Sequence, residues 1–338
     1  MQPVPAYGSD ATGLICGYRF RPGHAGAAIG TDEALQRLAV ANDDEGSAFT
    51  WLHFDLTHVA TERTLRERFA LPEMFFETLH EGSRSTRIEY ADDRLVVVVN
   101  DVLYDFGFEA THLATLWVCV DRRLVVTCRR KPLRSIDRLR VAVRDGETFE
   151  SPASLLVHLL RDQADVLIGI VRDATARVDG IEDTLLAGRL DAKRANLGGL
   201  RRVLVRLQRL LAPEPAALFR LLNRPPLWVP DVDSQALRHS TEEFAAVLSD
   251  MAGLLERIKL LQEEVADQIR EEGNRLLMLL SVLTVIGLPF TVVGGLFGMN
   301  VGGIPFAEDK AGFWLIVGLV AAVTISGMWV LLDRWRRR

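Results

Sequence analysis

The sequence predicts an α+β protein, with a cytoplasmic α/β domain at the N-terminus, a long helical stalk and two transmembrane helices at the C-terminus. Three observations predict this order. Strand-like and helix-like patterns alternate up to about residue 150, strand signals then stop, and two uncharged apolar stretches lie in the last quarter of the chain. The predicted segments are an α/β domain (1–150), a cytoplasmic helical region (151–233), a stalk helix (234–275), a first transmembrane helix (276–297), a loop (298–312), a second transmembrane helix (313–332) and a basic tail (333–338).

The N-terminal domain combines short runs rich in Val, Leu and aromatic residues with segments of helical spacing. The expected strands are 14–20, 49–56, 94–103, 113–120 and 124–128. The expected helices are 32–41, 61–69, 72–81 and 132–143. Beyond this domain we expect a helix from 152 to about 190 and a second over 191–211, followed by a connection punctuated by Pro213, Pro215, Pro225, Pro226 and Pro230.

A heptad pattern begins near Ser234 and predicts one helix that continues into the first apolar stretch, on the order of 90 Å long. The pattern has two interpretations. The helix packs its apolar face on its own domain, or copies of the helix associate around a common axis. The direct continuation into the apolar stretch favours self-association. The two apolar series are Leu237, Phe244, Met251, Ile258 and Val265, and Thr241, Leu248, Leu255, Gln262, Ile269 and Leu276.

The two C-terminal stretches, 276–297 and 313–332, contain no charged residue. At 1.5 Å rise per residue, each spans roughly 30 Å, the thickness of the hydrocarbon core of a bilayer. Four arginines lie in the tail and Arg270 and Arg275 precede the first span, whereas the loop between the spans has one lysine. The positive-inside rule therefore predicts a multi-pass protein of the cytoplasmic (inner) membrane, with both termini in the cytoplasm and the loop outside.

Composition narrows the classes of function. The whole chain carries a net charge of −5 and the residues after 275 carry +2, so the soluble part, 1–275, carries −7, which argues against nucleic-acid binding. The N-terminus has no signal-peptide pattern. Cys16, Cys119 and Cys128 are scattered, which predicts reduced thiols. The seven histidines lack metal-site spacing, although His53 and His58 are close enough in sequence to meet. Because no catalytic arrangement or phosphate-binding loop is visible, we expect no enzymatic activity and no bound cofactor.

One stripe of the first span is small or polar. Such a stripe either packs closely against another helix or lines a water-filled pore. With Asn274 and Asn300 at its two ends, we favour a pore. The stripe consists of Asn274, Leu277, Ser281, Thr284, Leu288, Thr291, Gly295 and Gly298. Together with Leu280, the leucines Leu277 and Leu288 are candidates for hydrophobic constrictions.

The first span is followed directly by Phe297-Gly298-Met299-Asn300. This Tyr/Phe-Gly-Met-Asn signature, placed between two C-terminal spans, resembles the CorA superfamily of divalent-metal transporters. The continuation Val-Gly-Gly-Ile-Pro over 301–305 resembles its zinc-transporting ZntB branch. The residues that stand at the family's spacing from the motif are Asn274, Leu277, Leu280, Pro289 and Thr291.

The resemblance implies a homopentamer whose first spans surround a pore and whose cytoplasmic domains form a funnel. It also implies uptake of zinc and related divalent cations, coupled to protons. We expect Gly298, Met299 and Asn300 to form the selectivity filter, because an amide oxygen accepts hydrogen bonds from the waters of a hydrated cation. Glu308 and Asp309 would attract cations to the loop.

Neither span contains an ionisable residue, so protons would have to use pore water or cytoplasmic groups. For the same reason the spans offer no inner-shell zinc ligand. Two alternatives remain open. One is a CorA-like magnesium, cobalt or nickel channel. The other is a cytoplasmic interaction domain that the two spans merely anchor in the lipid bilayer.

Overall fold

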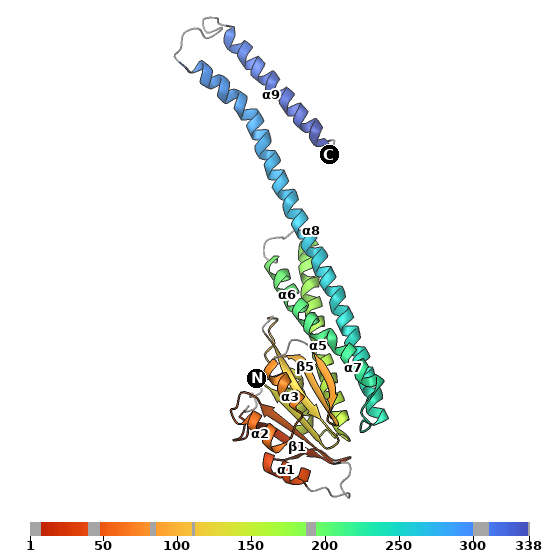
Figure 1. The fold of residues 1–338 in the computed structure, drawn as a ribbon. Helices are drawn as coiled ribbons and strands as arrows, with labels where there is room; N and C mark the ends of the chain where they lie inside the picture. The colour runs from red at the N-terminus through yellow and green to blue at the C-terminus, as the bar shows by residue number, and fades with distance from the viewer. Residues whose placement is uncertain are drawn as a thin grey trace. The chain divides into compact units, whose positions relative to one another are not determined.

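The computed structural model describes residues 8–39, 48–81, 86–109, 112–186, 194–299 and 311–336 (Figure 1). The chain forms two compact units, Met1–Leu261 and Gln262–Arg338, each of which we describe by itself. The mixture of a strand-containing domain, a long helix and two apolar C-terminal helices confirms the predicted fold class.

A mixed β-sheet forms the centre of the first unit. In the described part of the chain it has seven strands in the order β2-β1-β3-β7-β6-β5-β4. β3 and β7 are parallel, and every other neighbouring pair is antiparallel. A hairpin turn joins β6 to β7, and in it Asp121 Oδ1 accepts hydrogen bonds from the amides of Arg123 and Leu124, both at 2.8 Å. The strands are β1 (Leu14–Phe20), β2 (Ala27–Ala28), β3 (Phe49–Asp55), β4 (Arg87–Ala91), β5 (Arg94–Val102), β6 (Leu113–Val120) and β7 (Leu124–Arg129).

Helices cover both faces of the sheet. In β5, Val96 and Val98 pack in the cluster that contains α1 (Thr31–Ala39), α2 (Thr61–Arg68) and α3 (Glu73–Glu81). The alternate residues Val97 and Val99 pack with α4 (Arg134–Arg144) and the start of α5 (Pro152–Leu186). Because both faces are buried, the strand consists of consecutive apolar residues rather than an alternating pattern. The result is a three-layer α/β domain.

A helical layer extends this domain. α5, α6 (Arg194–Leu211) and the first part of α8 (Asp231–Phe297) share a second apolar cluster and run side by side in Figure 1. Five members of the predicted heptad series are buried in the clusters of this unit: Leu237, Phe244, Leu248, Met251 and Ile258. Over 237–258 the seam therefore packs on its own domain, and the preference for self-association is wrong for this part of the helix, because α5, α6 and the sheet domain of the same chain cover it.

Two substitutions in α8 test this packing. Ile258 is 0% exposed, whereas Leu260, two residues further on, is 56% exposed. We expect Ile258→Ala to lower the free energy of unfolding by about 2–4 kcal/mol, because the cavity cannot refill completely. Leu260→Ala should change it little. The measurement is denaturant unfolding of the purified full chain at several protein concentrations. Intrachain packing predicts no concentration dependence of the loss, and equal losses for the two variants would contradict it.

Three elements differ from the sequence prediction: α7 (Pro213–Asn223), β4 and the two-residue strand β2. α7 lies where a proline-rich connection was expected. Pro213 is the first residue of this helix. An amide hydrogen at that position would have no acceptor within the helix, so proline, which lacks this hydrogen, is tolerated there. The unpredicted β4 is an edge strand that is largely exposed and carries charged residues, a composition that limits edge-to-edge pairing and weakens the strand signal. The other predicted strands and helices agree with the structure to within a few residues at each end.

The second unit contains the rest of α8 and the helix α9 (Gly312–Arg336), and both helices are long and apolar enough to cross a membrane. α9 approaches α8 closely at Gly327, where an added Cβ would lie 3.3 Å from Val285 Cγ1. Val285 belongs to one half-covered face of α8. That face consists of Met278, Val282, Val285, Pro289 and Val293.

Candidate functional site

The predicted pore-lining stripe lies on a different face of α8 from the one that meets α9. Ser281 and Thr284 each precede a residue of the half-covered face, and one residue turns the helix by about 100°. Every described member of the stripe is exposed, as is Leu280. The exposed members are Asn274, Leu277, Leu280, Ser281, Thr284, Leu288, Thr291, Gly295, Gly298 and Met299. Asn300, Glu308 and Asp309 lie outside the described residues.

The hydroxyl groups of the stripe present acceptors rather than donors. Ser281 Oγ donates to the Leu277 carbonyl at 2.9 Å, and Thr284 Oγ1 donates to the Leu280 carbonyl at 2.8 Å. Thr291 makes the same bond one helical turn back, at 2.9 Å. Because each hydroxyl hydrogen is used within the helix, the remaining oxygen lone pairs are left to accept hydrogen bonds. The stripe is thus an uncharged acceptor surface, which suits the water shell of a cation.

Sequence reasoning did not extend this stripe towards the N-terminus of α8. The same alternating steps of three and four lead from Asn274 to a run of exposed positions that alternate with the buried heptad face. The run consists of Arg270, Asp267, Glu263, Leu260, Glu256, Gly253, Ser249, Ala246 and Glu242. The heptad pattern could have indicated this run, because two of the seven positions of a heptad lie on the side of the helix opposite the apolar seam. Apart from Leu260 and Arg270, the residues of this run are small or acidic.

Two of these acidic side chains have local partners. Asp267 pairs with Arg270 at 2.6 Å, and Glu256 pairs with Lys259 at 3.1 Å. All four groups are largely exposed, so each pair contributes little to stability. Glu242 and Glu263 remain as exposed carboxylates on the same side of the helix.

The histidines do not build a metal site. Among the described residues, no group of three or more His, Cys, Asp and Glu side chains is placed to hold a metal ion. His53 is buried, and its Nε2 accepts a hydrogen bond from Arg129 Nε at 3.0 Å while its Nδ1 contacts Thr127 Oγ1 at 2.9 Å. Burial and the Arg129 charge hold the pKa of His53 well below its usual value. His53 is therefore a neutral core residue, and His58 contacts a different group, the Ala60 amide.

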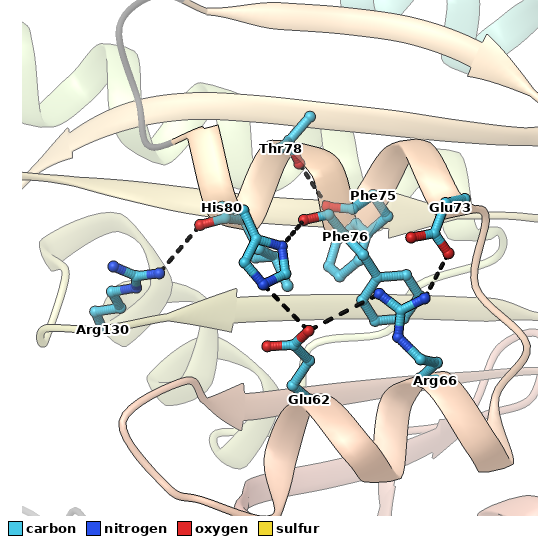
Figure 2. A network of polar contacts seen from close by, with 9 residues as sticks. Glu62, Arg66, Glu73, Phe75, Phe76, Thr78, His80 and Arg130 are labelled. Carbon is cyan, nitrogen blue, oxygen red and sulfur yellow. Dashed lines mark hydrogen bonds and ion pairs between the residues drawn. The ribbon is translucent and has the colours of Figure 1, made fainter.

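A surface network joins α2 to α3 (Figure 2). His80 Nε2 lies 3.4 Å from Glu62 Oε1, and its Nδ1 lies 2.7 Å from the Phe76 carbonyl oxygen. The Arg66 guanidinium pairs with both Glu62 and Glu73 and lies 4.0 Å from the centre of the Phe76 ring. Each of the three groups Glu62, Arg66 and Glu73 has a partner within the network, and because these side chains are well exposed, each pair contributes little to stability.

The three cysteines are free thiols. Burial raises the pKa of Cys119 to about 12 and that of Cys16 to about 11, so both thiols stay protonated at neutral pH. Cys119 and Cys128 are not cross-strand partners, because Cys128 pairs with Trp117 and Cys119 pairs with Val126.

Comparison with known proteins adds the family. The family described as "CorA-like Mg2+ transporter protein" matches residues 46–337. The divalent cation transporter CmaX of Pseudomonas aeruginosa is 30% identical over 98% of this chain and 100% of its own length. The zinc transport protein ZntB of Yersinia enterocolitica is 26% identical over 84% of this chain and 87% of its own.

Solved structures agree in fold. The full-length CmaX protein superposes with a TM-score of 0.81 at 27% identity, covering 97% of this chain and 99% of that chain. The CorA magnesium transporter from Methanocaldococcus jannaschii has a TM-score of 0.72 at 18% identity, covering 95% and 97% of the two chains, which shows the common fold alone. The chain thus belongs to the CorA-like family and is a transporter of divalent cations rather than an enzyme.

Proposed function

We propose that the protein takes up zinc through a pore that the apolar segments of α8 from several copies line together. The observation that carries the proposal is the stripe from Asn274 to Gly295, which is exposed, uncharged and turned away from the α9-contacting face. One helix per chain cannot enclose a channel, so the pore requires self-association. The resemblance of the Gly298-Met299-Asn300 motif supports five copies, with these three residues as the selectivity filter.

Zinc is favoured over magnesium by two observations. The sequence Val-Gly-Gly-Ile-Pro after the motif resembles the zinc-transporting branch, and the 26% identical relative from Yersinia enterocolitica is a zinc transport protein. The CmaX relative is described only as a transporter of divalent cations. A CorA-like magnesium, cobalt or nickel channel is therefore the competing function.

The ion passes at least partly hydrated in this proposal. Residues 276–297 include no Cys, His, Asp or Glu, the side chains that bind zinc directly in proteins. The acceptor oxygens of Ser281, Thr284 and Thr291 instead meet the hydrogen atoms of the water shell. Leu277 and Leu288 narrow the same path and form hydrophobic gates.

Charged groups outside the spans supply the attraction for cations. On the cytoplasmic side, Glu242 and Glu263 are exposed carboxylates on the side of α8 that carries the stripe spacing. In the loop, Glu308 and Asp309 would raise the local cation concentration at the outer mouth. The basic tail and Arg275 support an inner-membrane protein with both termini in the cytoplasm.

Metal flux into proteoliposomes tests the proposal. The purified full chain is reconstituted, and entry of Zn²⁺ and Mg²⁺ is followed in parallel with metal-sensitive dyes, with and without a pH gradient. We expect Zn²⁺ entry above that of empty liposomes and faster than Mg²⁺ entry. Faster Mg²⁺ entry would replace the zinc proposal by the magnesium alternative. No entry of any divalent cation would overturn the pore and favour a membrane-anchored interaction domain.

A further inference from the structure

Two carboxyl side chains are buried in the first unit at the junction of β5, α5 and α7. Asp101 lies near the end of β5, and Glu214 lies in the first turn of α7. Glu214 is 1% exposed and Asp101 is 3% exposed. Burying an ionised carboxylate is costly unless hydrogen bonds or opposite charges replace water, so the surroundings of each group decide its protonation.

Both oxygen atoms of the Asp101 side chain accept hydrogen bonds. Its Oδ2 accepts hydrogen bonds from the Ser135 amide at 3.0 Å and from Ser135 Oγ at 2.5 Å. Its Oδ1 accepts a hydrogen bond from the Val102 amide at 2.7 Å. Three donors, together with the charge of Arg134, oppose the burial that raises the pKa of Asp101.

Glu214 has much weaker support. Among the described residues its carboxyl group receives one hydrogen bond, from Gln163 Nε2 of α5 at 3.2 Å. The same Gln163 nitrogen also donates to the Asn100 carbonyl of β5, at the shorter distance of 2.8 Å. The arrangement links β5, α5 and α7 through one neutral amide group, and it supplies no positive charge to Glu214.

The electrostatics agree with this geometry. Burial raises the pKa of Glu214 from its ordinary value of 4.5 to about 8, the Gln163 hydrogen bond opposes the rise, and the Asp101 charge adds to it. The N-terminal end of α7 also favours a negative charge, but this does not offset burial. Among the described residues, the charge that acts on Glu214 is that of Asp101 on β5, and the charge that acts on Asp101 is that of Arg134 on α4. At neutral pH the carboxyl group of Glu214 therefore keeps its proton.

α7 is well placed to pass a change at Glu214 to α8. Leu218 and Leu222 of α7 pack in the same apolar cluster as Leu237 of α8. α7 ends at Asn223, and α8 begins shortly afterwards, at Asp231. Ionised Glu214 would face the Asp101 charge, and no positive charge of the described residues acts on it, which weakens the packing of α7 against the sheet and α5.

We propose that Glu214 is a proton-binding site through which the pH of the cytoplasm regulates the transporter. The protonated side chain keeps α7 packed on β5 and α5, and loss of the proton loosens α7 at the base of α8. The regulation of transport rests on the proposed function, whereas the proton site itself does not. It also places a proton-linked group outside the membrane spans, which contain no ionisable residue.

The direction of the pH effect follows from proton counting. Between pH 4.5 and about 8 the folded chain holds the Glu214 proton and the unfolded chain does not. The stabilisation is therefore complete below pH 4.5, declines as the pH rises and is lost above about pH 8. The protonated fraction of folded Glu214 falls roughly tenfold between pH 7 and pH 9.

The test compares the wild-type full chain with Glu214→Gln, in which a neutral amide replaces the carboxyl group. The control is Glu89→Gln, because Glu89 is an exposed residue of β4. Thermal unfolding is measured from pH 5 to pH 9.5. We expect Glu214→Gln to remove the decline of Tm with pH and to have the higher Tm above pH 8, while Glu89→Gln follows the wild type.

A second variant keeps the test decisive if Glu214→Gln folds poorly. Gln163→Leu removes the hydrogen bond that lowers the pKa of Glu214, so the end of the Tm decline should move to higher pH. Zinc flux is then measured at internal pH 6 to 9. We expect wild-type flux to change with a midpoint near pH 8, and the Glu214→Gln flux to be constant.

The outcomes separate the two proposals. Identical Tm profiles for Glu214→Gln and the wild type would overturn the proton site. A Glu214→Gln variant with an altered Tm profile but a wild-type pH profile of flux would overturn the regulation. If the wild type carries no zinc at any pH, the proposed function fails, and the Tm profiles still decide whether Glu214 binds the proton.

Discussion

Asn300→Ala is expected to abolish most divalent cation flux while the protein still folds and assembles. In the proposed filter, each copy contributes one amide oxygen that accepts a hydrogen bond from the water shell of the ion. Alanine removes these acceptors and leaves the shell of the ion without replacement contacts. Losing about 2–3 kcal/mol of hydrogen bonding to a charged species corresponds to roughly a 100-fold lower rate. Zinc entry into proteoliposomes measures the effect.

The matched control for this variant is Lys310→Ala, which truncates another residue of the same loop. Removing a positive charge near the mouth should leave flux at or above the wild-type level. Size-exclusion chromatography in detergent checks that both variants assemble as the wild type does. Wild-type flux in Asn300→Ala would remove the filter from the proposed function.

Thr284→Trp is expected to block the pore, and Leu283→Trp is expected to be tolerated. Thr284 lies on the predicted stripe, whereas Leu283 is 70% exposed on another face of α8. Adjacent residues point about 100° apart on a helix, so the two variants add the same bulk in different directions. A ring of tryptophans in the path should reduce flux to below about a tenth of wild type, because the path is both narrowed and dewetted.

The same pair distinguishes a pore from a packing surface. If the stripe packs against another helix, Thr284→Trp should break the assembly, since small residues there allow close approach of the helices. Flux and oligomeric state are therefore measured on the same preparations. An assembled Thr284→Trp protein without flux supports the pore, whereas equal flux in the two variants contradicts it.

The heptad of α8 shows how far periodicity carries a prediction. The spacing correctly indicated one long helix with an apolar seam, because helical geometry is local. It did not identify the surface that covers the seam. α5 and α6 cover it in the same chain, at residues such as Met251 and Ile258. A heptad specifies which face of a helix is apolar, and any helix with a matching apolar face can pack against it.

For the candidate site too, one part was predictable from spacing along the chain and another part only from the structure. The stripe from Asn274 to Gly295 was predicted as a set from its spacing, and the structure adds that it is exposed and does not face α9. α7 was missed because Pro213 was taken as a helix breaker, although proline is compatible with the first position of a helix. With α7 unrecognised, the burial of Glu214 could not be predicted.

The sequence by itself determined the two apolar helices, the change from a strand-containing domain to long helices after about residue 150, and the motif that marks the family. Each of these depends on neighbouring residues or on a short period along the chain. Only the tertiary structure decided which helices bury the heptad and how Glu214 is surrounded. Burial raises the pKa of Glu214 to about 8, and Gln163 and Asp101, which are far from it in the chain, adjust that value. Desolvation is a property of the folded surroundings, and no local pattern around Glu214 encodes it.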